Sequence, residues 1–213
     1  MDKPGGWKQL VGCVAYEAPD ALVLIDPLAP PEGTPDHQRF WSALDGDVER
    51  SGRPLAILLG DEWHDRSARA MYDRYRERTA VTVWAHEAAR GAVDCQITDF
   101  VREGASLPGG VVAYEIGVPY PSEVVYSLPA HQALVCADCV VGAGDGKLRL
   151  APSWWAGEAP AEQERYRTAF RPSLRRLLDL PLELIVTSHG PPVLQEGRAA
   201  LAAALDAPAW GEE

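Results

Sequence analysis

Apolar and polar segments along the first half of the chain predict strands and helices in turn. Two apolar segments, 9–16 and 21–28, flank the turn sequence EAPD, which is typical of an antiparallel pair. Further apolar segments at 54–60 and 80–86 enclose a stretch, 67–78, in which apolar residues recur at helical spacing. A strand, a helix and a strand in this order indicate strands of one sheet with the helix on its outer face.

The second half of the chain has shorter apolar segments, which predict an antiparallel meander followed by helices. These segments, joined by brief turns, lie at 109–117, 123–129, 131–142 and 147–152. We expect a helix at 160–180 to be interrupted at Pro172, because proline has no amide hydrogen to donate. A buried strand at 182–190 and an alanine-rich helix at 197–207 complete the pattern.

A further helix is predicted at 36–52, with Phe40, Trp41 and Leu44 on one face and Gly52 at its end. The length of 213 residues, of which 46% are hydrophobic, is enough for one large α/β domain. We therefore expect residues 1–213 to form a single domain.

The net charge of −11 disfavours partners that are themselves anionic. Nucleic acid and an anionic membrane surface would repel such a chain, so we expect neither as a partner. No apolar stretch approaches the roughly 20 residues that span a bilayer, and the N-terminus has no pattern of a signal peptide. The expected location is cytoplasmic, and the expected partner is a small-molecule ligand, with a homodimer left open. Cys136 and Cys139 have C-x-x-C spacing, but their apolar strand favours buried thiols over a redox or zinc site.

Three loops contain residues that can bind a metal ion. The sequence GDEWHDR at 60–66 follows a buried strand and leads into a helix, ALVCAD ends at Asp138, and IVTSHGPP contains His189. Together these loops resemble the motifs of the metallo-β-lactamase fold superfamily. The resemblance implies an αββα sandwich, in which two mixed sheets pack face to face with helices outside. It also implies a paired metal centre at one edge of that sandwich.

The first loop departs from the superfamily motif T-H-x-H-x-D-H. With Gly60 at the threonine position, Asp65 matches the aspartate, whereas three histidine positions hold Asp61, Trp63 and Arg66. A shift by one residue would bring His64 near the first histidine positions, so its assignment stays open. The middle histidine of the superfamily should fall within 117–125, which contains Tyr120 but no histidine.

These departures leave two hypotheses for function. Tryptophan cannot bind zinc through its side chain, and arginine would place a fixed positive charge in the site. The first hypothesis is a protein with a degenerate metal site, without a dinuclear centre, efficient hydrolase activity or any cofactor. In that protein, Arg66 would replace the metal by pairing with Asp65, Asp138 or both.

The second hypothesis is a mononuclear hydrolase, and whether the chain is an enzyme stays open. One divalent zinc, iron or manganese ion would be bound by Asp65, Asp138 and His189, with help from Asp61 or His64. Metal-activated water would then attack an ester, thioester or lactam-type bond of a small molecule, with Asp65 as the catalytic carboxylate.

Aromatic residues are expected to form the wall of the site. Trp63 and Tyr120 belong to the loops just described, and Trp154 and Trp155 precede a predicted helix. The alternative for the last two is that one anchors this helix to the sheet while the other is partly exposed.

Overall fold

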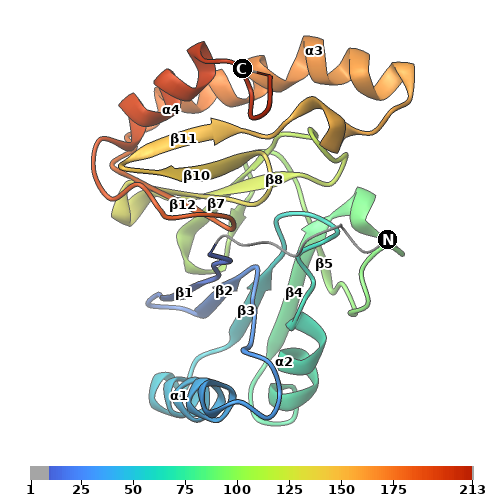
Figure 1. Ribbon diagram of the computed structural model, residues 1–213. Helices are drawn as coiled ribbons and strands as arrows, with labels where there is room; N and C mark the ends of the chain where they lie inside the picture. The colour runs from blue at the N-terminus through green and yellow to red at the C-terminus, as the bar shows by residue number, and fades with distance from the viewer. Residues whose placement is uncertain (1–9, 213) are drawn as a thin grey trace.

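Two sheets pack face to face, with helices on their outer faces, in a computed structural model that describes residues 10–212 (Figure 1). The first sheet has the order β1-β2-β3-β4-β5, in which β1 and β2 are antiparallel and the other neighbours are parallel. The elements of this first half are β1 (Val14–Glu17), β2 (Leu22–Ile25), α1 (Pro35–Ser51), β3 (Leu55–Leu58), α2 (Ala68–Tyr75), β4 (Val81–His86), the short helix η1 (Glu87–Ala89) and β5 (Asp99–Val101).

The second sheet has the order β12-β9-β8-β7-β6, and a separate hairpin of β10 and β11 lies beside it (Figure 1). Only β12 and β9 run parallel in this sheet. Its elements and their neighbours are β6 (Ser106–Leu107), η2 (Pro108–Gly110), β7 (Val111–Glu115), β8 (Val124–Leu128), η3 (Pro129–His131), β9 (Ala133–Cys136), β10 (Val140–Gly144), β11 (Lys147–Leu150), η4 (Ser153–Ala156), α3 (Pro160–Arg175), η5 (Arg176–Asp179), β12 (Leu184–Thr187) and α4 (Gly197–Asp206).

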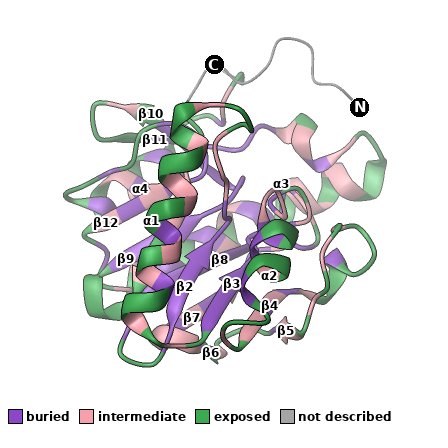
Figure 2. Cartoon of the chain, turned by 90° about the horizontal axis from the view of Figure 1, so that it is seen from below, coloured by how far each residue is buried: buried purple, intermediate pink, exposed green. Residues whose placement is uncertain are grey.

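The hydrophobic core has three layers that follow from this arrangement. Between the sheets, Val23, Val111 and Tyr126 belong to one buried cluster. A second cluster lies under α1 and α2, and a third lies under α3 and α4. Figure 2 shows buried strands behind helices whose outer sides are exposed. Each sheet is therefore covered on both faces, which explains why its strands read as nearly continuous apolar segments.

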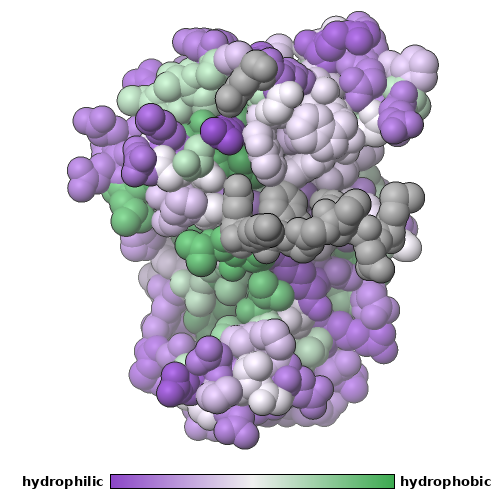
Figure 3. Space-filling view, viewed as in Figure 1, coloured by the Kyte–Doolittle hydropathy of each residue, from purple (hydrophilic) through white to green (hydrophobic). Residues whose placement is uncertain are grey.

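Polar residues dominate the lower part and the upper right of the face seen in Figure 3, whereas the alanine-rich helix α4 gives the upper left a more apolar surface. Apolar residues gather near the middle of this face, between the two halves of the sandwich. Among the described residues, no helix is both long and apolar enough to cross a membrane.

Most predicted elements are confirmed, with two corrections. The predicted strand 131–142 is two strands, β9 and β10, separated by a bend at Asp138 that moves the chain out of the second sheet. The helix α3 continues through Pro172 instead of stopping there. Phe170 and Leu174 are buried on either side of Pro172, and we attribute the continuity of the helix to their packing, which outweighs one lost backbone hydrogen bond.

Asp45 joins the two helices that cover the first sheet. Its carboxylate accepts hydrogen bonds from Arg74 (2.6 Å), Arg78 (3.0 Å) and the Tyr75 hydroxyl (3.0 Å), all at or just beyond α2. These contacts, that of Arg74 foremost, lower the pKa of Asp45 from 3.8 to about 2. Because the folded-state pKa lies below the unfolded value, the contacts stabilise the fold above about pH 4 and lose that effect as the pH falls toward 2.

Replacing Asp45 by asparagine is therefore expected to lower the free energy of unfolding by about 1 kcal/mol near pH 7, after allowance for solvent screening. Urea unfolding at several pH values would measure this. The difference from the wild type should disappear near pH 2. Asp47→Asn, which removes only an exposed ion pair with Arg50, is the matched control and should change stability by less than about 0.5 kcal/mol. Equal effects of the two variants would contradict the prediction.

Candidate metal centre

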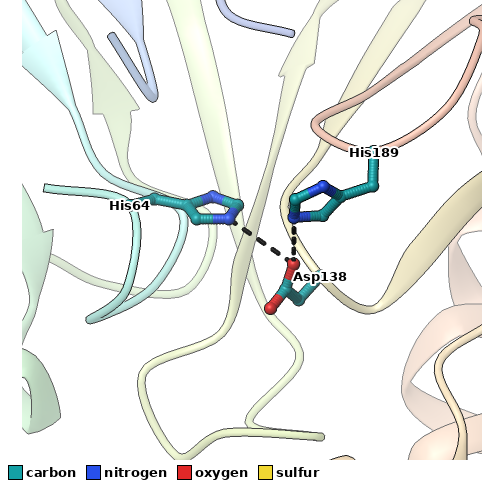
Figure 4. Close-up of side chains that lie close together, drawn as sticks. All are labelled: His64, Asp138 and His189. Carbon is teal, nitrogen blue, oxygen red and sulfur yellow. Dashed lines mark ion pairs between the residues drawn. The ribbon is translucent and has the colours of Figure 1, made fainter. Parts of the chain in front are cut away.

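Three buried residues from three loops form a cluster with the geometry of a metal site. Among the described residues, His64, Asp138 and His189 each offer one ligand atom, and these atoms all lie within 4.8 Å of one another. His64 Nε2 lies 3.4 Å and His189 Nε2 lies 3.0 Å from Asp138 Oδ1. Figure 4 shows both rings turning a nitrogen toward this oxygen. The three residues are no more than 4% exposed.

The topology of the sheets brings these loops together. Asp138 follows β9 and His189 follows β12, and the parallel pairing of these strands puts Thr187 opposite Cys136 at their carboxyl ends. The two residues therefore emerge at the same edge of the second sheet. His64 comes from the first sheet, in the loop between β3 and α2. The cluster thus lies where one edge of each sheet meets the other.

Asp26 orients the ring of His64. It directly follows β2, and its Oδ2 lies 2.8 Å from His64 Nδ1 and accepts a hydrogen bond from Ser188 Oγ at 3.0 Å. Its other oxygen accepts from the Gly60 amide at 2.7 Å. Burial raises the pKa of Asp26, but the adjacent His64 outweighs this and holds that pKa below its usual value. An ionised carboxylate only accepts, so Nδ1 carries a proton, and Nε2 faces the cluster.

Gly60 allows this close approach. A Cβ at this position would lie 2.5 Å from Ala137 Cβ and 3.1 Å from Asp26 Oδ2. Gly60→Ala is expected to lower the free energy of unfolding by about 2 kcal/mol, because the contact with Ala137 Cβ can be relieved only by backbone movement. Gly46→Ala, in α1 with open space around it, is the control and should raise stability slightly. Chemical denaturation of both variants would test this; a neutral Gly60→Ala would contradict it.

Asp61 places a fourth possible metal ligand beside the cluster. Its Oδ1 accepts a hydrogen bond from the Trp63 amide at 2.7 Å, while its Oδ2 lies 3.9 Å from His64 Nε2. This Oδ2 is buried and accepts no hydrogen bond from the described residues. Burial and the neighbouring carboxylates Asp138 and Asp26 raise the pKa of Asp61 to about 7, against the lowering effect of His64.

The electrostatics of the cluster suit a cation. Burial raises the pKa of Asp138, but the imidazoles of His189 and His64 outweigh it and hold that pKa well below its usual range. Burial lowers the pKa of His64, yet Asp26 and Asp61 shift it well above its ordinary value. Two imidazole nitrogens and two buried carboxylate oxygens, Asp138 Oδ1 and Asp61 Oδ2, which both lack a hydrogen-bond donor among the described residues, are a set of ligand atoms that fits zinc, iron or manganese.

Two residues predicted to belong to the site lie elsewhere. Asp65 Oδ2 accepts a hydrogen bond from the Asp94 amide at 2.6 Å, so this carboxylate is outside the cluster. The guanidinium of Arg66 donates to the Gly12 carbonyl at 3.2 Å, and no ion pair within residues 10–212 joins it to Asp65 or Asp138. Arg66 therefore does not replace a metal in the way expected, although its charge helps to lower the pKa of Asp26.

The aromatic residues separate into two groups. Trp63 is 62% exposed, and its ring lies 6.3 Å from that of Tyr120 beside the cluster. Burial first, and then the negative charges of Asp138 and Asp61, raise the pKa of Tyr120.

The other two tryptophans pack near the C-terminus. Trp154 lies against Gly211, and Trp155 packs edge-on against Trp210 with ring centroids 5.9 Å apart. Trp155 also packs on the core cluster under α3 and α4, while Trp154 is 55% exposed. This is the anchoring arrangement that the sequence left open as the alternative to a pocket wall.

Asp26 and Glu123 are parts of the site that sequence reasoning missed. Each is a buried acidic residue next to an apolar strand, Asp26 directly after β2 and Glu123 directly before β8. An acidic residue directly beside an apolar strand was the available signal for a site, because acidic residues are rarely buried without a partner.

Known proteins resemble this chain in structure. No family model and no curated protein matches the sequence. The structure matches that of TTHA1623 in a di-iron-bound form, with 22% identity, 92% of this chain and 94% of that chain covered, and a TM-score of 0.61. It also matches the metallo-β-lactamase family protein TTHA1429 from Thermus thermophilus (15% identity, 92% and 73% covered, TM-score 0.60). The BLEG-1 B3 metallo-β-lactamase is similar as well (17% identity, 94% and 97% covered, TM-score 0.59).

The chain has the metallo-β-lactamase fold. The predicted αββα sandwich is thereby confirmed. In this metallo-β-lactamase fold, the cluster of His64, Asp138 and His189 is a candidate metal centre.

Proposed function

We propose that this chain binds one divalent metal ion between His64, Asp138 and His189, and that it hydrolyses an ester, thioester or lactam-type bond of a small molecule. The observation that carries the proposal is the Asp26–His64 hydrogen bond of 2.8 Å. A carboxylate on Nδ1 holds an imidazole in the orientation and tautomer that leave Nε2 available as a ligand. Here Nε2 faces Asp138 Oδ1, which His189 Nε2 also approaches.

A single ion, in place of a pair, is supported by the residues around the cluster. Trp63 has no ligand atom and its side chain is largely exposed. Arg66 donates a hydrogen bond to the Gly12 carbonyl. The cluster therefore consists of histidine and aspartate side chains, without an arginine among them. A second ion would therefore lack the imidazoles that a dinuclear site needs. The centre is degenerate in this sense, having ligands for one ion.

The chain's own residues would divide the remaining work. The chemistry that a divalent ion supplies at such a site is Lewis-acid polarisation of a carbonyl group and activation of water. Asp26 keeps the His64 ring in place, and Asp61 Oδ2 adds an acceptor at the edge of the cluster. Trp63 and Tyr120 would form the wall beside it, offering flat apolar surface to a substrate. The net charge of −11 favours neutral or cationic substrates over polyanions.

A metal titration tests the proposal. The protein is purified without chelator, analysed for its metal content, stripped, and titrated with Zn²⁺, Fe²⁺ and Mn²⁺ by calorimetry. We expect one ion per chain. Two ions per chain would contradict the mononuclear site, and no binding of any of the three would contradict the metal centre itself. Hydrolysis of a panel of small esters, thioesters and lactams by the loaded protein would then test the reaction.

A metal-free binding protein is the second candidate. The specific observation in its favour is the position of His64, whose imidazole lies among Asp26, Asp61 and Asp138 and whose pKa these carboxylates raise. A protonated His64 would supply the positive charge that a metal supplies in the first proposal. Nitrogen-15 NMR of the stripped protein with and without Zn²⁺ separates the two: loss of the Nε2 proton on titration supports the metal centre, and an unchanged imidazolium supports the metal-free protein.

A further inference from the structure

Glu123 is a fully buried carboxyl group that the proposed function does not yet use. It precedes β8 and is 0% exposed. Its Oε1 accepts hydrogen bonds from two consecutive amides, those of Asp138 at 3.1 Å and Cys139 at 2.8 Å. A buried acidic side chain is rare unless its contacts compensate for the loss of water. These two amides are the contacts that compensate Glu123 for its burial.

The bend at Asp138 needs such an acceptor. The strand β9 ends at Cys136 and β10 begins at Val140, so the amides of residues 138 and 139 lie between two ladders that belong to different sheets. Buried amides without an acceptor destabilise a fold, and strand neighbours are not in place here. A single carboxylate oxygen serves both amides. The peptide plane that carries Asp138 is thus fixed from the neighbouring strand β8.

Glu123 acts from outside the cluster of ligand atoms. The group of atoms within 4.8 Å of one another comprises His64, Asp138 and His189 in the described part of the chain, without Glu123. Its hydrogen bond with Asp138 is made to the backbone amide of that residue.

We propose that Glu123 is a positioning residue, which holds the Asp138 carboxylate toward His64 and His189 by accepting the amides of Asp138 and Cys139. The inference rests on the proposed metal centre. Removal of the carboxylate would free the bend, so that Asp138 Oδ1 would no longer keep its place between the two imidazoles. Metal affinity would fall although no ligand had been removed, by roughly 10- to 100-fold as for other groups that orient ligands.

The experiment compares three variants by Zn²⁺ calorimetry and by amide hydrogen exchange of the metal-free protein. Glu123→Ala removes the acceptor and should lose both amide protection at residues 138–139 and roughly 10- to 100-fold in Zn²⁺ affinity. Glu123→Gln keeps an oxygen acceptor and should stay within about threefold of the wild type. Glu123→Asp keeps the carboxyl group but is one methylene too short to reach both amides, and it decides the question if the alanine variant does not fold.

Glu115→Ala is the matched control. Glu115 is also a carboxylate that accepts a backbone amide, that of Glu103 at 2.9 Å, but it is not in the cluster. Its replacement should leave Zn²⁺ affinity unchanged. If Glu123→Ala or Glu123→Asp lost amide protection but kept the wild-type affinity, Glu123 would be structural only and the inference would be overturned. If the wild type itself bound no metal, the proposed function would fail and the inference with it, which is a distinct result.

Discussion

Replacing Asp138 by alanine is expected to weaken Zn²⁺ binding by roughly 1000-fold, or about 4 kcal/mol. Asp138 Oδ1 is the atom that both imidazoles approach, at 3.0 Å from His189 and 3.4 Å from His64. Its removal leaves two neutral nitrogen donors without the anionic oxygen between them. Calorimetric titration of the stripped protein measures the effect. Removal of His189 should have a comparable consequence, because the cluster then keeps only one imidazole.

Asp65→Ala is the control for this first prediction. Asp65 matches the aspartate of the superfamily motif, yet its carboxylate accepts a hydrogen bond from the Asp94 amide instead of facing the cluster. We expect its replacement to leave Zn²⁺ affinity within about threefold of the wild type, because no ligand or orienting contact is lost. If Asp65→Ala abolished binding and Asp138→Ala did not, the ligands would lie in different loops from those proposed. Thermal unfolding of each metal-free variant would show that a loss of affinity is not a loss of fold.

Asp26→Asn has the second largest expected effect, a loss of roughly 10- to 100-fold in metal affinity. Asp26 uses one oxygen for the Gly60 amide and the other for His64 Nδ1 and Ser188 Oγ. Both oxygens therefore act as acceptors. An asparagine must turn its NH₂ group toward one of these two sides, where it meets donors. The ring of His64 then loses either its hydrogen bond to residue 26 or the hydrogen bond from the Gly60 amide that holds its loop in place.

Ser188→Ala provides the comparison for Asp26→Asn. It removes one hydrogen bond to Asp26 and leaves the contacts with His64 and Gly60 in place. We expect a change in metal affinity below about threefold. A loss as large as that of Asp26→Asn would mean that the effect spreads through the packing of the loop, whereas an unchanged affinity in Asp26→Asn would show that His64 needs no orienting partner.

The fold was predictable from the sequence to a large extent. Apolar periodicity identified α1 with its end at Gly52, the β3–α2–β4 unit and the antiparallel pair of β1 and β2. Periodicity reports which side chains are buried, and burial is what the sandwich requires of these elements. It could not place the break at Asp138, because apolar residues continue on both sides of it. The choice between one strand and two is made by the neighbouring strands with which each part pairs.

The candidate site was predictable only in part. His64, Asp138 and His189 were named from the loops that carry them, and the structure brings these three together. Asp65 and Arg66 were expected beside them, because the motif was matched by position along the chain. The turn from Gly60 to Arg66 instead directs the side chains of Asp65 and Arg66 toward Asp94 and Gly12. Side-chain direction in an irregular loop depends on its backbone angles, which a pattern of residue types does not reveal.

By itself, the sequence determined the alternation of strands and helices, the acidic surface and the chemical types of the donors. These are properties of local composition and spacing. Only the tertiary structure decided which donors meet. The parallel pairing of β9 with β12 brings Asp138 to His189, and the packing of the first sheet against the second brings in His64. Asp26 and Glu123 act across gaps of 38 and 15 residues, because a contact between distant segments exists only after the sheets have formed.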